Sequence, residues 1–394
     1  MPRAPRVRNA CLLTREPSGG PFLPLIEEHR CFFCLESFQP ADIKLLVRIP
    51  LFPHSLMKVT IRSVAKLAGV APSTVSHYLN QSAPVAADTA QSVERAIAAL
   101  NYRVDLGARS LRMRKTRSIG LIIPNIMSPY FGEIAQTIEH ALWDKDHQML
   151  LCISEQELER EVIQVASLAS RQVDGILIVY QGQPSKAVQF SKNHSLPIVF
   201  VDRRIPGEDS VASDNFNGGQ LAARHLTELG HRCIGMLCGG AEIENIADRI
   251  DGFLAELARQ QIDMNSEYIL HEPQELQLGL RVGELLKKQP RPTAIFATTD
   301  IVAVGAWLAL LESGRRVPQD MSIIGFDNIE MSRFLNPPLT TIGPATREIA
   351  AKAVELLLQR ISESEHCANR EPRNVVIPPA ILVRGSTLAV QSAR

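Results

Sequence analysis

The sequence predicts a small all-α domain near residue 60, followed by a large α/β core built on mainly parallel sheets. Two observations support this prediction. Residues 61–80 contain two short helical patterns separated by Gly69. After Arg117, short runs rich in Ile, Leu and Val alternate with amphipathic helical stretches. With 394 residues, of which 45% are hydrophobic, the chain can bury two or three separate cores.

The two short helices carry the start and stop signals of a helix-turn-helix. Thr60 can cap the first helix, and Gly69 can adopt the left-handed conformation that ends it. Pro72 suits the first turn of the second helix, from which Val75 points back to the first. The remaining face of the second helix is polar, as in helices that enter the DNA major groove. A plain helical bundle can show the same local pattern.

The distribution of charge favours DNA binding. Residues 58–117 hold ten Lys or Arg against three acidic residues, a net charge of +7, whereas the whole chain has 42 basic and 42 acidic residues. The neutral total therefore combines a basic segment with an acidic remainder. A basic segment that coincides with a helix-turn-helix indicates a phosphate-binding surface more strongly than a merely solvated face.

Longer motifs resemble those of the lactose-repressor (LacI/GalR) family, in the family's order and spacing, over roughly residues 58–387. The head carries "VTIRSVAKLAGVAPSTVSHYLN" and "VERAIAALNY", and the core carries "RSIGLIIPNIMSPYF", "RIDGF", "VPQDMSIIGFDN" and "PPLTTI". The resemblance implies a transcriptional regulator, most often a repressor, that binds double-stranded operator DNA under the control of a small effector. It also implies an all-α helix-turn-helix head and an α/β core of two doubly wound, periplasmic-binding-protein-like lobes.

The family pattern divides the chain as follows. A DNA-binding head spans residues 58–103, a hinge helix spans residues 104–117, and an effector-binding and dimerisation core spans residues 118–394. Within the core, the N-lobe would take residues 118–216 and 345–371. The C-lobe would take residues 217–342 and 374–387, with the closing strands.

Residues 1–57 fit none of these parts. They lack periodicity and a signal-peptide pattern. Because Met57-Lys58-Val59-Thr60 resembles the start of the family's proteins, a misassigned upstream start is the leading interpretation, ahead of a disordered natural extension and an ordered extra domain. Cys31 and Cys34 in this segment have metal-site spacing, but they form a lone pair without a second CxxC. We therefore expect free thiols, no metal and no cofactor.

The resemblance assigns DNA contacts residue by residue. His77 stands where many members carry an arginine, and a neutral imidazole cannot make the bidentate contact of arginine with guanine. A solvated histidine at the helix end is the alternative. Ala71 replaces the serine that usually caps this helix. Base edges would meet Pro72, Ser73, Ser76 and His77, while Thr60, Thr74, Asn80, Thr89 and Tyr102 would complete the interface with DNA, chiefly at phosphates.

The segment "LGARSLRMRKTRS" matches the family's hinge-helix pattern. The resemblance implies that this short helix folds only on DNA, with Ala108 and Leu111 at the minor groove. Leu111 would wedge between two base pairs and kink the duplex. Ordinary packing of Leu111 against the core is the alternative. Val104 and Asp105 replace the usual Pro-Asn and place a carboxylate near phosphate, which should weaken binding.

Ligands of doubly wound sheets bind at the carboxyl ends of the strands. The resemblance implies that Arg249 and Asp300 hold polar groups of the effector through charge-assisted hydrogen bonds. Alternatively, Asp300 could cap the next helix, and Arg249 could form a surface ion pair. The candidate effector-binding residues are Tyr130, Phe131, Asp202, Arg249 and Asp300.

The ligand is expected to be a carbohydrate, because a carboxylate and a guanidinium together suit polyhydroxy compounds. A pentose, a hexose or a sugar acid, with or without a phosphate, fits this chemistry. Ile243 stands where a purine-responsive member presents an arginine, which disfavours a nucleobase.

Rival classes have less support. The sequence contains no GxSxG nucleophile motif, no HExxH metal motif, no GxxxxGK(S/T) phosphate-binding loop and no GxGxxG after a strand, so we expect no enzyme. A periplasmic sugar-binding protein without a regulatory role would not need the basic segment. No stretch reaches the length of a membrane helix. Free thiols suit a reducing cytoplasm, where we expect the protein. The tail "STLAVQSAR" has no leucine heptad, which favours a homodimer on a pseudo-palindromic operator over a tetramer.

Overall fold

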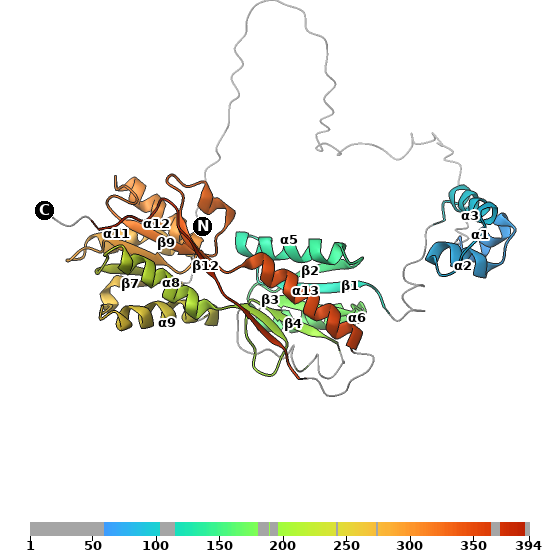
Figure 1. Ribbon diagram of the computed structural model, residues 1–394, viewed down its shortest axis with the longest axis horizontal. Coiled ribbons are helices and arrows are strands. Elements are labelled where there is room, and N and C mark those ends of the chain that lie inside the picture. The colour runs from blue at the N-terminus through green and yellow to red at the C-terminus, as the bar shows by residue number, and fades with distance from the viewer. Residues whose placement is uncertain are drawn as a thin grey trace, which may run out of the picture. The chain divides into compact units, whose positions relative to one another are not determined.

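The computed structural model describes residues 59–102, 115–179, 189, 196–241, 243–272, 275–363 and 371–390 (Figure 1). The chain divides into two compact units, Met1–Tyr102 and Arg103–Arg394, which we describe separately. The predicted extension at residues 1–57, most of the hinge with Ala108 and Leu111, and the Cys31–Cys34 pair lie outside the described residues. None of the helices in the described ranges is long and apolar enough to cross a membrane.

The described residues of the first unit form an all-α head, as the sequence predicts, and this head has three helices. Helices α1 (Ile61–Ala68), α2 (Pro72–Asn80) and α3 (Ala87–Ala99) pack around a small apolar core. Thr60 caps α1, because its hydroxyl accepts from the Ser63 amide, and Gly69 ends α1 at φ +68°. Ala71 precedes α2 without a side-chain cap, and Val75 is fully buried. The helix-turn-helix geometry is therefore confirmed.

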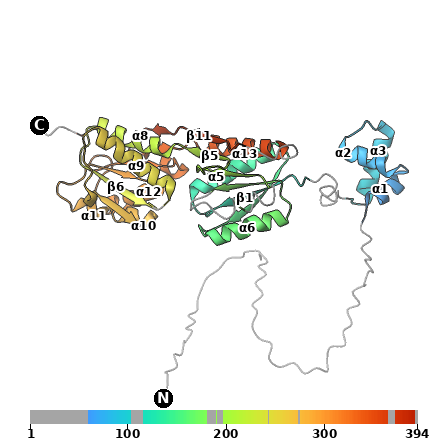
Figure 2. The same ribbon diagram turned by 90° about the horizontal axis from the view of Figure 1, so that it is seen from below.

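The first lobe of the second unit is a six-stranded parallel sheet in the order β11-β5-β4-β3-β1-β2. Helices α5 and α13 contribute to one buried core against this sheet, and α6 contributes to another (Figure 2). Continuous apolar strands fit this environment because both faces of the sheet are covered. The elements are β1 (Ser118–Ile123), α5 (Pro129–Trp143), β2 (Gln148–Ile153), α6 (Leu158–Ser170), β3 (Gly175–Val179), β4 (Ile198–Val201), β5 (Ser210–Ser213), α13 (Thr346–Glu363) and β11 (Asn374–Ile377).

The second lobe repeats this plan in the order β12-β10-β9-β8-β6-β7, with only β12 antiparallel to its neighbour. Separate apolar cores lie on the two sides of the sheet. The elements are α8 (Asn215–Glu228), β6 (Ile234–Gly239), α9 (Glu244–Arg259), η1 (Ser266–Tyr268), β7 (Ile269–Glu272), α10 (Glu275–Leu280), α11 (Val282–Leu286), β8 (Ala294–Ala297), α12 (Asp300–Glu312), β9 (Ser322–Phe326), η2 (Glu330–Arg333), β10 (Thr340–Gly343) and β12 (Ala380–Leu382).

The closing strands correct one expectation. We expected the strands within residues 374–387 to belong to the C-lobe, but β11 pairs with β5 in the first sheet, and only β12 joins the second. β5 would otherwise leave an open edge, and Ser210 and Asn374 join their side chains across this pair at 2.6 Å. Pro378 and Pro379 follow β11 and provide no ladder donors, so the strand ends before the chain enters the other lobe.

Helices α8 and α9 approach closely at two glycines. A Cβ at Gly219 would lie 2.0 Å from the carbonyl oxygen of Arg249, and one at Gly252 would lie 1.9 Å from that of Phe216. Any side chain at either position would therefore push the helices apart. This contact fixes the turn of α9 that carries Arg249.

Candidate DNA-binding helix and ligand pocket

Helix α2 presents the predicted polar face. Its exposed side chains include Pro72, Ser73, His77 and Asn80, while Thr74 and Ser76 are half-buried. Asn80 is partly engaged within the helix, because its amide donates to the Ser76 carbonyl oxygen at 2.8 Å.

His77 is oriented by a residue that the sequence pattern did not indicate. Its Nδ1 lies 2.9 Å from the hydroxyl oxygen of Ser82, just beyond α2. One ring nitrogen is therefore engaged within the head, and Nε2 is left as a single donor or acceptor, depending on the tautomer. Ser82 has no local signature, because its effect depends on how the chain turns after α2.

Three other proposed DNA contacts serve the head itself to different degrees. The Thr60 hydroxyl is engaged in the α1 cap, and Tyr102 packs against the apolar core of the head. Thr89 is half-buried in the first turn of α3. A phosphate contact by any of these three residues would therefore have to use atoms that are not already engaged within the head.

A cavity of about 150 Å³ lies where the two lobes meet. It brings together four of the five predicted effector residues: Tyr130, Phe131, Asp202 and Arg249. A larger hollow of about 870 Å³ also has Asp327 in its lining, but buried polar groups converge on the smaller cavity. The further lining residues are Asn125, Ser128, Gln156, Gly240, Ile243, Asn245, Ile246, Thr299, Ile301, Asp327 and Ile329.

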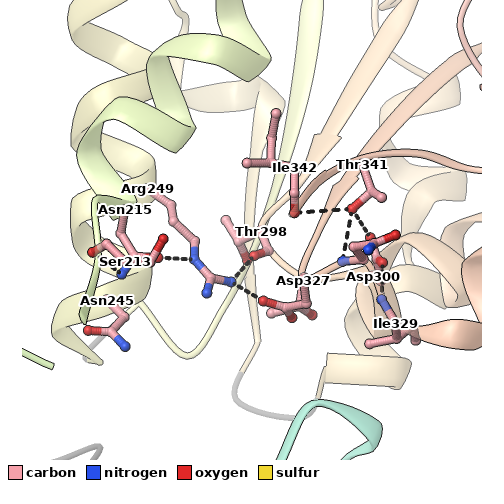
Figure 3. Close-up of polar contacts among 12 residues, drawn as sticks. Ser213, Asn215, Asn245, Arg249, Thr298, Asp300, Asp327, Ile329, Thr341 and Ile342 are labelled. Atoms are coloured by element: carbon pink, nitrogen blue, oxygen red, sulfur yellow. Dashed lines mark hydrogen bonds and ion pairs between the residues drawn. The ribbon is translucent and has the colours of Figure 1, made fainter. Parts of the chain in front are cut away.

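Arg249 is buried rather than a surface residue, with 3% of its area exposed. Its Nε donates to Asn215 Oδ1 at 2.9 Å, and its Nη1 donates to the Thr298 carbonyl oxygen at 2.8 Å (Figure 3). Nη1 also lies 2.9 Å from Asp327 Oδ1, and the guanidinium carbon lies 3.7 Å from the centre of the Phe326 ring. Nη2 has no hydrogen-bond partner among the described residues, so it remains a donor for a ligand.

Asp202 follows β4 in a left-handed conformation at φ +61° and has 3% of its area exposed. Asn245, from the other lobe, donates from Nδ2 to Asp202 Oδ2 at 3.1 Å. Next to this contact, Arg203 and Glu244 form an ion pair between the same two segments. Burial raises the pKa of Asp202 to about 6, and the nearby Arg249 only partly opposes this rise.

Tyr130 and Phe131 form one wall of the cavity from the first turn of α5. Their rings meet edge to face, with centroids 5.5 Å apart, and both are buried. Burial and the nearby Asp202 raise the pKa of Tyr130 well above its ordinary value, so its hydroxyl keeps its proton. Asn125 holds the start of α5, because its Oδ1 accepts from the Ser128 amide at 2.7 Å.

Asp300 does not line the cavity. It is fully buried, and its carboxylate accepts from the Ile329 amide at 2.9 Å and from the Thr341 hydroxyl at 2.7 Å. Thr299 caps α12, so Asp300 is not the helix cap either. Asp327, which follows β9, occupies the cavity instead. The strand-end rule could have identified Asp327 in "SIIGFDN", but it could not rank Asp327 against Asp300.

Asp202→Asn is expected to stabilise the ligand-free protein at pH 8 and to have little effect near pH 4. Because the folded pKa of Asp202 is raised from 3.8 to about 6, its contribution to stability is greatest below about pH 4 and is lost as the pH rises through 6. The gain at pH 8 is at most about 3 kcal/mol. Urea unfolding at several pH values measures it, with exposed Asp263→Asn as control. A pH-independent loss of stability would contradict the burial of this charge.

Comparisons with known proteins agree with both parts of the architecture. The sequence matches the model for bacterial regulatory proteins of the lacI family over residues 60–105, and the model for periplasmic binding protein-like domains over residues 223–387. It is 36% identical over 334 residues to the HTH-type transcriptional repressor PurR of Haemophilus influenzae strain PittEE, covering 84% of this chain and 99% of that protein.

Solved structures show the same likeness. The lac repressor dimer bound to operator and the anti-inducer ONPF aligns with a TM-score of 0.75 and 28% identity, covering 84% of this chain and 99% of that chain. A LacI family transcriptional regulator from Enterococcus faecium with bound ribose aligns with a TM-score of 0.62 and 32% identity, covering 70% of this chain and all of that chain.

Proposed function

We propose that a small carbohydrate controls the binding of this protein to a pseudo-palindromic operator. The premise is that the chain belongs to the lacI family of bacterial regulatory proteins. It is therefore a DNA-binding transcriptional repressor with an effector-binding domain, not an enzyme. The observation that carries the carbohydrate part is the cavity in which Asp202, Asp327 and Arg249 converge. Carboxylates accept from sugar hydroxyls, and the guanidinium donates to them.

The shape and walls of the cavity support the same ligand class. Tyr130 and Phe131 offer an aromatic surface, which suits the apolar face of a sugar ring. The E. faecium regulator, which is 32% identical, has ribose bound. Ile243 lies in the cavity wall and provides no polar group toward a nucleobase.

On the DNA side, α2 is the proposed recognition helix. Ser73, Ser76 and His77, beside Pro72, are proposed to meet base edges, and Thr74, Asn80 and Thr89 to meet phosphates. Outside the described residues, Ala108 and Leu111 are proposed to enter the minor groove. The effector would act by favouring one arrangement of the two lobes, and its effect is limited to its differential affinity for the two arrangements.

Dimerisation is proposed to use the exposed apolar face of α10 and α12. These helices are in close contact, because a Cβ at Gly279 would lie 2.3 Å from the Val302 carbonyl oxygen. Their exposed leucines lie on these two neighbouring helices, and we propose that they provide the apolar surface of the dimer interface. They are Leu276, Leu280, Leu308 and Leu311.

Leu311→Asp is expected to yield monomers and to weaken operator binding by roughly 100-fold or more, because each monomer then holds only one half-site. Analytical ultracentrifugation and gel retardation measure the two effects. Ile163→Asp is a matched control, since Ile163 on α6 has the same exposed fraction of 65% as Leu311. A Leu311→Asp protein that remains dimeric would place the interface elsewhere.

The function is tested with the purified full-length chain and a library of genomic fragments. We expect selective retention of fragments that contain a pseudo-palindrome, and a change in their affinity when a monosaccharide is added. Retention of no fragment, with or without sugars, would overturn the proposal. Fragment binding that responds to no carbohydrate would overturn only the effector class.

A further inference from the structure

The charged groups of the cavity are unevenly matched. Among the described lining residues, two are carboxylates, Asp202 and Asp327, and one is a guanidinium, Arg249. Asp327 and Arg249 lie 2.9 Å apart, and Arg249 also faces the Phe326 ring and two neutral oxygens. The positive charge of Arg249 is therefore already balanced within the protein.

Asp202 forms no ion pair with any described residue, although Arg249 is near enough to oppose part of the rise in its pKa. Its Oδ2 accepts from the Asn245 amide, but its Oδ1 is buried and meets no hydrogen-bond partner among the described residues. The adjacent Arg203 is paired with Glu244. A buried acceptor without a donor is costly, and it is satisfied when a ligand hydroxyl donates to it. The buried Tyr130 hydroxyl is next to Asp202, which raises its pKa, but within the described residues it makes no hydrogen bond of ordinary geometry either.

These charges distinguish neutral ligands from anionic ones. A hydroxyl group provides one donor and two acceptor sites, so a polyol can satisfy Asp202 and Arg249 Nη2 together. A phosphate or carboxylate would have to leave water and face Asp202 without an unbalanced cation on the described walls, which is unfavourable. The small cavity volume of about 150 Å³ favours a compact ligand, such as a single sugar ring.

We propose that the pocket selects an uncharged monosaccharide and rejects its phosphorylated and carboxylated derivatives, with Asp202 as the residue that excludes anions. This inference rests on the proposed function, because it concerns the effector of the same pocket. It narrows the sequence-based expectation, which allowed sugar acids and sugar phosphates.

The test uses the full-length protein and isothermal titration at pH 8 with matched compounds: D-ribose, D-ribose 5-phosphate and D-ribonate, and the corresponding sets for D-xylose and D-glucose. We expect the neutral member of at least one set to bind at least 100-fold more tightly than its charged members. Equal or tighter binding of a phosphate or acid would overturn the inference and leave a carbohydrate effector in place. No binding by any member would overturn the carbohydrate proposal as well, without affecting DNA binding.

Asp202→Asn provides the second measurement, because it removes the charge and keeps an oxygen acceptor. We expect the ratio of affinities between the neutral sugar and its acid to fall at least tenfold, mainly because the acid binds more tightly. Asp251→Asn, on an exposed position of α9, is the control and should leave the ratio unchanged. A ratio in Asp202→Asn equal to that of the unmodified protein would show that Asp202 does not exclude anions.

Discussion

His77→Arg is expected to change which operator sequence the protein prefers, rather than simply to weaken its binding. The imidazole can offer DNA only Nε2, because Nδ1 lies 2.9 Å from the Ser82 hydroxyl. Arginine can instead form a bidentate contact with guanine, which discriminates against other bases by about 1–3 kcal/mol, or roughly 5- to 150-fold. Selection of binding sites from a random duplex library measures the change, with guanine expected to be enriched at one position in each half-site.

Two variants separate base reading from general binding. Ser82→Ala keeps the imidazole but removes its hydrogen-bond partner. We therefore expect the protein to prefer one base less strongly at the same operator position. Lys66→Ala, in the last turn of α1, changes charge in the head without altering α2. It should lower affinity similarly for all sequences, as expected of a contribution to phosphate binding. If His77→Arg and the original protein select the same consensus, His77 does not read a base.

The second large effect is expected at Arg249. Arg249→Lys should weaken effector binding by roughly 100-fold or more, because lysine cannot reproduce the planar set of donors that reaches Asn215, Thr298 and the ligand. Breaking the buried pair with Asp327 should also cost about 3–5 kcal/mol of stability if the lysine fails to reach it. Calorimetric titration with the effector and urea unfolding measure the two effects separately.

Asp300→Asn is the informative contrast to Arg249→Lys. Asp300 is equally buried, but its carboxylate holds Ile329 and Thr341 rather than facing the cavity. We therefore expect lower stability with a smaller change in effector affinity. If Asp300→Asn abolished effector binding at unchanged stability, and Arg249→Lys did not, our assignment of the pocket would be wrong.

Local signals predicted most of the fold correctly. Thr60, Gly69 and Pro72 mark the ends of α1 and α2, and their effects depend only on neighbouring residues. The strands were also predicted from local sequence, because strands of a sheet that is covered on both faces are continuous apolar runs. The assignment of β11 to the first sheet was missed because a four-residue strand does not specify its partner. That choice depends on the free edge of β5, which is more than 160 residues earlier in the sequence.

The pocket was predicted less completely, for a related reason. Both Asp300 and Asp327 follow strands of the second sheet, and the sequence does not show which carboxylate faces the cleft. The outcome depends on backbone conformation, because Asp327 lies at φ +105° while Asp300 is the first residue of a regular helix. The contact of Asp202 with Asn245 joins the two lobes and has no local signature at all.

The last two strands of the chain affect when the core can fold during synthesis and how it responds to truncation. β11 provides an edge of the first sheet and β12 an edge of the second. Beyond β12, the Val390 amide donates a hydrogen bond to the Leu229 carbonyl oxygen. Neither lobe can therefore be finished until almost the whole polypeptide has left the ribosome, although domains made of continuous sequence can fold during synthesis. A frameshift or proteolytic cut near residue 370 would thus damage both lobes at once, whereas the head, which lies wholly upstream, would keep its fold.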